Sequence, residues 1–255
     1  MSARRRLDAE LVRRGLAKSR VEARTLVESG RVLVGGAVAI KVARLVAAAE
    51  PVVVEGPPAR YVGRGGEKLE HALTAFGIDV AGWRALDAGA STGGFTDCLL
   101  QRGAQHVVAV DVGHGQLHER LRADERVTNV ERTNVRDITP AVSGGPVDIV
   151  VADLSFISLT KVIGALGGVC KPGAPMVLLV KPQFEAGRVE VSRGRGVITD
   201  PAIWDRVRDE ITEALVSAGC QVVGWTVSPI TGAEGNREFL VHARAPGDVH
   251  TKEVQ

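Results

Sequence analysis

The stretch that decides the fold is LDAGASTGGF, residues 86–95. A second segment, HVVAVD at residues 106–111, follows it after the length of one helix. A strand that runs into a glycine-rich turn lets the backbone approach a ligand where a Cβ would clash. The helix after such a turn offers free N–H groups. The acid that ends the second strand, Asp111, is placed to accept ribose hydroxyls. The two segments therefore predict a nucleoside pocket.

The turn also lacks two familiar patterns. Neither GxGxxG nor GxxxxGK[ST] occurs there, which disfavours a dinucleotide or a nucleoside triphosphate as the ligand. A compact nucleoside such as S-adenosylmethionine fits better.

Strand and helix patterns alternate from residue 66 to the end of the chain. We expect strands at 84–88, 106–111, 127–131, 148–153, 176–180, 221–228 and 238–243, and helices near 67–76, 94–102, 117–123, 158–169 and 202–218. This order predicts an α/β fold with a mainly parallel, doubly wound sheet, whose ligands gather at the carboxyl ends of the strands.

The first 60 residues form a different, basic module. They hold 12 Lys and Arg against 6 Asp and Glu, whereas the other 195 residues hold 20 against 24. Two short helices, a hairpin at RVLVGGAVAI and a strand at 52–54 resemble the S4-like RNA-binding domain. We expect the basic residues to contact RNA phosphates, the alternative being an ordinary solvated helix face. The candidates are Arg4, Arg6, Arg13, Arg14, Lys18, Arg20, Arg24 and Arg31.

Two prolines, Pro57 and Pro58, indicate a boundary between these regions. The expected division is a small α+β domain at 1–57, a linker at 58–63 and an α/β domain at 64–255.

The cysteine content and the positions of the charged residues indicate the cellular compartment. Cys98, Cys170 and Cys220 are widely spaced, so neither a disulfide framework nor a zinc site is expected, and the interpretation is a cytoplasmic protein. Charged residues interrupt every apolar stretch before membrane-spanning length, so membrane insertion is not expected. Nothing in the sequence indicates an oligomeric state.

Charged residues stand at or near the ends of several expected strands. Asp153 ends DIVVAD, Lys181 ends PMVLLVK and Glu238 opens the last strand, while Lys68 begins the helix before the first strand. A lysine and a carboxylate beside a cofactor pocket indicate proton handling. Taken singly, Lys68 is better explained as an ordinary surface lysine. The alternative roles are a helix cap for Asp153 and a surface ion pair with Glu185 for Lys181.

The motifs GRGGEKL, LDAGASTGGFTD, VVAVDVGHGQL, VVADLSFISL, LLVKPQFE and GNREFLV, following an S4-like domain, resemble those of the TlyA family. That family resembles FtsJ-type ribose methyltransferases with a Rossmann-like class I domain, whose Lys-Asp-Lys-Glu tetrad would fall on Lys68, Asp153, Lys181 and Glu238, Lys181 being the base. The resemblance implies 2′-O-methylation of cytidine in 16S and 23S ribosomal RNA by S-adenosylmethionine, with ribosomal RNA or ribosomal subunits as partners.

The resemblance also assigns cofactor residues. Asp87, Gly89, Ser91 and Gly93 would line the methionine side, and Asp111 would bind the ribose. The adenine amino group would meet Asn134 or, alternatively, Asp137. FtsJ-type enzymes usually carry an acid where this chain has Asn134, and an amide carbonyl can accept the same hydrogen bond.

Several alternatives stay open. His114 and His118 have metal-ligand spacing, but a solvated pair is favoured and no metal site is expected. Residues 187–200, with Arg188, Arg193 and Arg195, are either a mobile loop that closes over RNA or a plain connection. Phe156 and Phe184 either pack in the core or stack on a flipped-out base.

Two other functions compete with methylation. One is membrane activity, because the family often carries a haemolysin label, and the other is a non-catalytic RNA-binding role in ribosome assembly. Neither an amphipathic basic helix of adequate length nor a secretion signal is found, and an intact tetrad disfavours the non-catalytic role.

Overall fold

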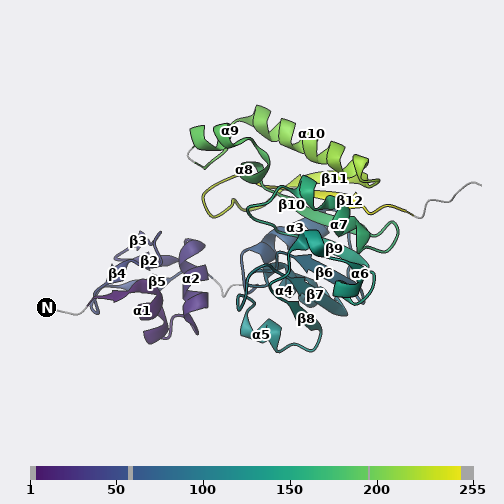
Figure 1. The fold of residues 1–255 in the computed structure, drawn as a ribbon. Helices are drawn as coiled ribbons and strands as arrows, with labels where there is room; N and C mark the ends of the chain where they lie inside the picture. Colours follow the sequence, from purple (N-terminus) through teal and green to yellow (C-terminus); the bar gives the residue numbers. More distant parts are fainter. Residues whose placement is uncertain (1–3, 57–59, 195, 248–255) are drawn as a thin grey trace, which may run out of the picture. The chain divides into compact units, whose positions relative to one another are not determined.

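The computed structural model describes residues 4–56, 60–194 and 196–247, without the side chains of Arg188, Val189 and Arg193. It divides into two compact units, Met1–Arg64 and Gly65–Gln255 (Figure 1). Pro57 and Pro58, and with them the start of the expected linker 58–63, lie outside the described residues. No helix within the described ranges has the length and apolar character to cross a membrane.

The first unit pairs two helices with short strands. Helices α1 (Leu7–Arg13) and α2 (Arg20–Glu28) pack with a sheet of order β3-β2-β5. Its strands are β2 (Val32–Val34), β3 (Ala37–Val38) and β5 (Val52–Val54), as the sequence predicts for the hairpin and the following strand. Two-residue strands β1 (Arg5–Arg6) and β4 (Leu45–Val46) also pair, which the sequence analysis missed.

A capping interaction begins α2. The Ser19 side chain accepts a hydrogen bond from the Glu22 amide at 3.2 Å, and the Glu22 carboxylate accepts one from the Lys18 amide at 2.5 Å. Ser19 therefore caps the helix, and the Glu22 carboxylate binds the amide one residue before the N-cap, where a complete capping box would bind the N-cap amide itself.

The second unit is built on a seven-stranded sheet of order β11-β12-β10-β9-β6-β7-β8. Its strands are β6 (Arg84–Ala88), β7 (His106–Val110), β8 (Val127–Val130), β9 (Ile149–Ala152), β10 (Pro175–Val180), β11 (Gln221–Val227) and β12 (Phe239–Arg244). Five strands run parallel, and β12 pairs antiparallel with both β10 and β11. The predicted mainly parallel sheet is confirmed.

The helices of this unit connect the strands. They are α3 (Gly65–Ala75), α4 (Gly94–Gln101), α5 (Glu119–Arg122), α6 (Pro140–Ser143), α7 (Ile163–Gly168), α8 (Pro182–Glu185), α9 (Arg188–Arg193) and α10 (Pro201–Ser217), with 3₁₀ turns η1 (Val135–Asp137) and η2 (Leu159–Lys161). The expected helix 158–169 is divided at Val162 into η2 and α7. The stretch 187–200, expected to be irregular, contains α9.

Helices pack against the sheet around a continuous apolar core. Side chains of α7 and α10, among them Ile163, Leu166 and Ile211, form one buried cluster with β6, β7, β9, β10 and β12. Figure 1 shows α10 running along the β11 side of this unit. After β6 the chain adds β7 and β8 on one side of that strand and then returns to add β9 on its other side. The direction in which strands are added therefore reverses at β6. Such a reversal opens a crevice at the carboxyl ends of the strands.

Candidate active site at the carboxyl edge of the sheet

The turn after β6 depends on a close backbone approach. Gly89 has φ of +82°, and a Cβ there would lie 2.5 Å from the carbonyl oxygen of Asp153. Glycine is therefore required on two grounds, the left-handed conformation and the missing side chain. This contact brings the ends of β6 and β9 together at the crevice.

Asp111, directly after β7, is held by backbone amides. Its Oδ2 accepts from the Ser91 N–H at 2.8 Å and its Oδ1 from the Gly113 N–H at 2.7 Å. The carboxylate is thus fixed before any ligand arrives, and its remaining lone pairs are available to hydroxyl donors.

A cavity of about 540 Å³ opens beside this carboxylate. It is lined by Gly89, Ser91, Asp111 and Asn134 of the expected cofactor set. Asp137 is not among the lining residues. Of the two candidates for the adenine end, the geometry therefore favours Asn134.

The cavity lining also includes residues that sequence reasoning missed. Val112, which is 72% exposed, and Gln116 both face the cavity, and the Ser91 hydroxyl lies 3.3 Å from the Gln116 side-chain oxygen. Their only sequence signal is their position within VVAVDVGHGQL, directly after Asp111.

Asp87, on β6, is not among the residues that line this cavity. The residue is fully buried, and its Oδ2 accepts a hydrogen bond from the Thr96 hydroxyl at 2.6 Å. Burial raises the pKa of the Asp87 carboxyl to about 7, and the charges of Asp153 and Asp111 act in the same direction. The expected contact of Asp87 with the methionine end stays a prediction.

Gly93 is packed closely against apolar side chains and is not among the residues that line the two cavities at this edge of the sheet. A Cβ at this position would lie 2.2 Å from Leu121 Cδ1 and 2.9 Å from Leu117 Cδ1. The glycine allows α4 to begin, with φ of +98°, directly against the apolar side chains around α5.

A second cavity, of about 230 Å³, adjoins the first and contains Lys181. The lysine Nζ lies 2.6 Å from Asp153 Oδ1 and donates a hydrogen bond to the Ser155 hydroxyl at 2.9 Å. The Lys181 side chain is 11% exposed. Gly89, Ser91, Asp153 and Ser155 line both cavities, so the amine stands next to the nucleoside space.

The alternative roles of Lys181, as a surface partner of Glu185, and of Asp153, as a helix cap, do not agree with the structure. Glu185 accepts from the Ser158 hydroxyl and the Leu159 amide, at 2.6 and 2.9 Å, and is not the ion-pair partner of Lys181. Burial raises the pKa of the Glu185 carboxyl. Asp153 is paired with Lys181, and the caps of η2 and α7 are Ser158 and Val162.

Lys68 and Glu238 form the other ion pair of the expected four. The Lys68 Nζ donates to Glu238 Oε2, and the two residues are 7% and 2% exposed. Gly65, at the start of the same helix α3, lines the Lys181 cavity, and a Cβ on it would lie 3.5 Å from Asp153 Oδ2. The four residues thus form two ion pairs, a partly exposed one in the cavity and a buried one that links α3 to the start of β12.

A third cavity, of about 700 Å³, shares Arg136, Phe156 and Ile157 with the first. Phe156 is 92% exposed and adopts a φ of +65°, which is strained for a residue with a Cβ. Its ring lies 5.2 Å from that of Phe184, whose ring is 5.7 Å from Lys181 Nζ. Of the two roles expected for Phe156, packing in the core is therefore wrong.

The histidines and the arginine-rich segment have local partners or fall outside the description. His114 pairs with Glu131, and the His118 ring nitrogen accepts from the Arg120 amide at the start of α5. The described residues contain no cluster suited to a metal ion. Arg195 and the side chains of Arg188 and Arg193 lie outside the described part of the chain.

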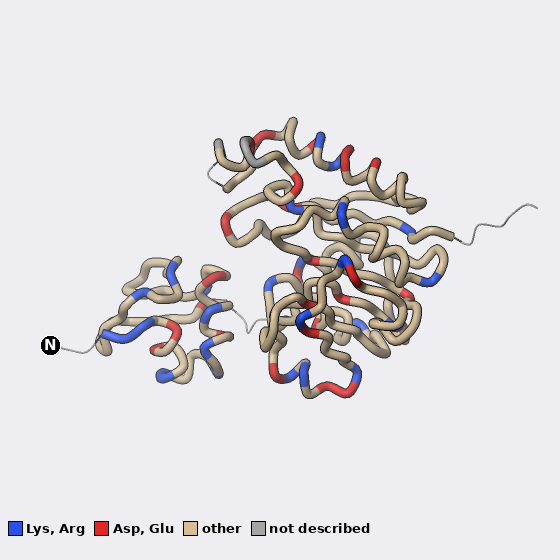
Figure 2. The backbone as a smooth tube through the Cα atoms, in the orientation of Figure 1, with Lys and Arg blue, Asp and Glu red and all other residues tan. Residues whose placement is uncertain are grey.

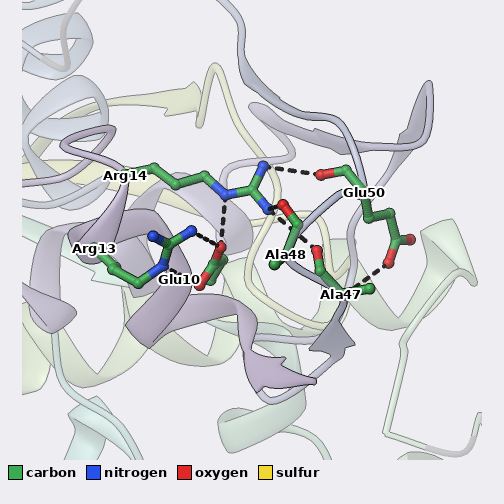
Figure 3. A network of polar contacts seen from close by, with 6 residues as sticks. All are labelled: Glu10, Arg13, Arg14, Ala47, Ala48 and Glu50. Atoms are coloured by element: carbon green, nitrogen blue, oxygen red, sulfur yellow. Dashed lines mark hydrogen bonds and ion pairs between the residues drawn. The ribbon is translucent and has the colours of Figure 1, made fainter. Parts of the chain in front are cut away.

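Figure 2 shows basic residues at several places along the first unit. Their side chains differ in burial and in hydrogen-bond partners. Arg14 is a structural clamp: its guanidinium donates to Glu10 Oε1 at 2.7 Å and to the carbonyl oxygens of Ala47, Ala48 and Glu50 at 2.8–3.2 Å (Figure 3). Its side chain is 18% exposed. Arg31 likewise donates to the carbonyls of Glu55 and Gly56.

The other basic candidates face solvent. Arg4, Arg6, Arg13, Lys18, Arg20 and Arg24 are all exposed. Arg13 still pairs with Glu10, through two hydrogen bonds of 2.8 and 2.5 Å.

Family models match both units of the chain. An S4 domain model matches residues 5–49 and an FtsJ-like methyltransferase model matches residues 61–245. The fold and the site thus define an FtsJ-like methyltransferase preceded by an S4 domain, as the sequence predicted.

Individual relatives narrow the family. The 16S/23S rRNA (cytidine-2'-O)-methyltransferase TlyA of Mycobacterium tuberculosis is 50% identical over 249 residues, which cover 97% of this chain and 92% of that protein. Hemolysin A of Brachyspira hyodysenteriae is 40% identical over 93% of this chain and 98% of its own. A solved putative hemolysin from Streptococcus thermophilus has a TM-score of 0.76 and 38% identity, covering 98% of this chain and 93% of that one. The chain belongs to the TlyA family of methyltransferases.

Proposed function

We propose that this enzyme transfers a methyl group from S-adenosylmethionine to the 2′-oxygen of cytidine in 16S and 23S ribosomal RNA. The observation that carries the proposal is the Lys181–Asp153 pair, 2.6 Å apart, in a cavity that adjoins the nucleoside space. The name of the Mycobacterium tuberculosis relative supports the substrate.

The first cavity fits the cofactor. Its volume of about 540 Å³ is in the range of small-molecule sites. Asp111 would bind the ribose hydroxyls and Asn134 the adenine amino group, while Gly89 and Ser91 would lie along the methionine end. Asp87 and Gly93, also expected on the methionine side, would at least hold this turn in shape through the Thr96 hydrogen bond and the packing against Leu117 and Leu121. When bound, the cofactor supplies a methyl group activated by its sulfonium charge.

The residues of the second cavity would handle the proton. A ribose hydroxyl placed in line with the methyl carbon loses its proton as the new O–C bond forms and the bond from sulfur to the methyl carbon breaks. The proposed proton acceptor is Lys181 Nζ in its neutral amine form, after the amine has released one proton to solvent. Asp153 and Ser155 hold the amine in place at 2.6 and 2.9 Å. Lys68 on α3 and Glu238 directly before β12 would complete the tetrad, because their ion pair links α3 to the sheet and places charged groups near the sugar.

The target base has a place beside these groups. Phe156, which is almost fully exposed, stands between the first and third cavities, and stacking on a nucleobase would cover its ring. Arg4, Arg6, Arg13, Lys18, Arg20 and Arg24 of the S4 domain would bind RNA phosphates. Arg14 and Arg31 would keep that surface folded.

Mapping of methyl groups tests this function. Ribosomal RNA from cells that lack the protein should lose 2′-O-methylcytidine from the 16S and the 23S RNA, and the purified protein with S-adenosylmethionine should restore it. An unchanged methylation map would contradict the proposal. The membrane-active alternative, which the name of the Brachyspira hyodysenteriae relative suggests, predicts leakage of liposomes, and the assembly-factor alternative predicts RNA binding without methyl transfer.

A further inference from the structure

Asp8 is a buried carboxylate at the start of the S4 domain. It is the second residue of α1 and is 3% exposed. The backbone around it is fixed, because the Leu7 amide donates to the Arg44 carbonyl at 2.8 Å and the Ala9 amide donates to Asp8 Oδ1 at 2.8 Å. A buried carboxylate of this kind requires a cationic partner.

Asp8 has two such partners, which come from different elements, β1 and α2. Arg6 donates from Nε to Oδ1 at 3.2 Å and from Nη2 to Oδ2 at 3.1 Å. Arg20, the first residue of α2, donates from Nη2 to Oδ2 at 2.8 Å. The hydrogen bond with Arg6 is the largest cause that lowers the pKa of Asp8 to about 2, so the carboxylate stays charged at neutral pH.

Both arginines remain open to solvent. Their side chains are 48% and 60% exposed, against 5% for Asp8. A guanidinium has five N–H donors; two of Arg6 and one of Arg20 are used on Asp8, which leaves three and four for a ligand. Two cations share one anion, so the group carries a net charge of +1 (two minus one). The shared carboxylate keeps the two guanidinium groups next to each other.

The neighbouring carboxylate Glu10 also binds two arginines, but one of them has a structural role within the domain. Glu10 accepts hydrogen bonds from Arg13 and Arg14. The other two guanidinium nitrogens of Arg14 donate to three backbone carbonyls. No backbone carbonyl is among the described hydrogen-bond acceptors of Arg6 or Arg20. The donors of this pair are therefore the ones left for an external anion.

We propose that Asp8 is a positioning residue that holds Arg6 and Arg20 together as a two-guanidinium clamp for a backbone phosphate of the RNA substrate. Planar guanidinium groups bind phosphate oxygens through paired hydrogen bonds, and their fixed orientation reduces the entropy lost on binding. The inference rests on the proposed function, since it requires RNA as the ligand of this domain.

The Asp8→Asn variant separates positioning from simple charge. Loss of one negative charge makes the S4 domain more basic, so general electrostatic attraction predicts tighter RNA binding. Loss of the clamp predicts weaker binding, because the two cations then repel each other and lose their common orientation. The two explanations differ in sign.

The experiment measures the dissociation constant of the full-length protein for a ribosomal RNA fragment at fixed salt. The matched control is Glu28→Gln, an exposed acid at the other end of α2 whose loss adds the same charge. We expect Asp8→Asn to raise Kd about 3- to 10-fold and Glu28→Gln to leave it unchanged or lower it. Equal or tighter binding by Asp8→Asn would overturn the clamp.

A second arm excludes a folding effect. In an Arg6→Gln/Arg20→Gln background, Asp8→Asn should change Kd by less than about twofold, because its action passes through those two arginines. A further large loss in that background would show that Asp8 only stabilises the domain, and would overturn the proposal. If wild-type protein methylates ribosomal RNA but Asp8→Asn binds it normally, the clamp fails and the enzyme function stands. If wild-type protein neither binds nor methylates RNA, both fail.

Discussion

Replacement of Gly89 by alanine tests the close contact that forms the site. An alanine with φ near +82° costs about 1 kcal/mol relative to glycine. The new Cβ would also lie 2.5 Å from the Asp153 carbonyl oxygen, and relief of such an overlap by a shift of backbone costs a further ~1–3 kcal/mol. The total loss of unfolding free energy is therefore about 2–4 kcal/mol, or roughly 5–15 °C in Tm for a domain of this size.

Gly173→Ala is the matched control for this substitution. Gly173 has φ of +70° in the same domain, but a Cβ there meets nothing within 4 Å. It should cost only the conformational term, about 1 kcal/mol or 2–4 °C. Thermal unfolding measures both variants.

Cofactor binding supplies a second readout for the Gly89→Ala variant. Because Gly89 lines both cavities and touches Asp153, S-adenosylmethionine affinity by calorimetry should fall about tenfold or more, whereas Gly173→Ala should bind normally. Equal stability losses in the two variants together with normal cofactor affinity in Gly89→Ala would refute the role assigned to this contact.

Three further predictions concern other parts of the molecule. Arg14→Ala should lower the unfolding free energy of the S4 domain by about 1–3 kcal/mol, measured by urea denaturation, because three backbone carbonyls lose their donor; unchanged stability would show that Arg14 is not a clamp. The pKa of Asp87 is about 7 in the folded protein against 3.8 as its ordinary value, so the protonated form is favoured on folding, and stability should decrease as pH rises from about 4 to 7. Asp87→Asn should flatten that part of the pH profile, and an identical profile would contradict the assignment. Asn134→Ala should weaken S-adenosylmethionine binding while Asp137→Ala should not, since only Asn134 lines the cavity; calorimetry showing the reverse would exchange their roles.

Elements governed by strong local signals could be predicted from the sequence. The strand 84–88 and the capping of α2 by Ser19 follow from apolar runs and a cap residue, and the structure has both. Asp111, Asp153 and Lys181 each follow a buried strand, so parallel pairing brings them to one edge whatever the details of packing. Residues at strand ends are thus predictable to the extent that the strands are.

Other features depend on tertiary contacts that the sequence does not display. Gly93 looks like a ligand-binding glycine, and only the positions of Leu117 and Leu121 show that it is needed for packing. Arg14 looks like any arginine of a basic helix, yet backbone carbonyls more than 30 residues away occupy its guanidinium. The two-residue strands β1 and β4 are too short to carry a periodic pattern.

Single-turnover methyl transfer from labelled S-adenosylmethionine to ribosomal RNA by Lys181→Ala, at saturating RNA, tests the central claim most directly. The matched control is Lys171→Ala, an exposed lysine that precedes β10 and pairs with Asp148, away from the strand ends that form the site. The account predicts that Lys181→Ala binds cofactor and RNA normally but transfers methyl groups at least about 100-fold more slowly, the usual size of a general base contribution, while Lys171→Ala retains the wild-type rate. A wild-type transfer rate in Lys181→Ala would contradict it.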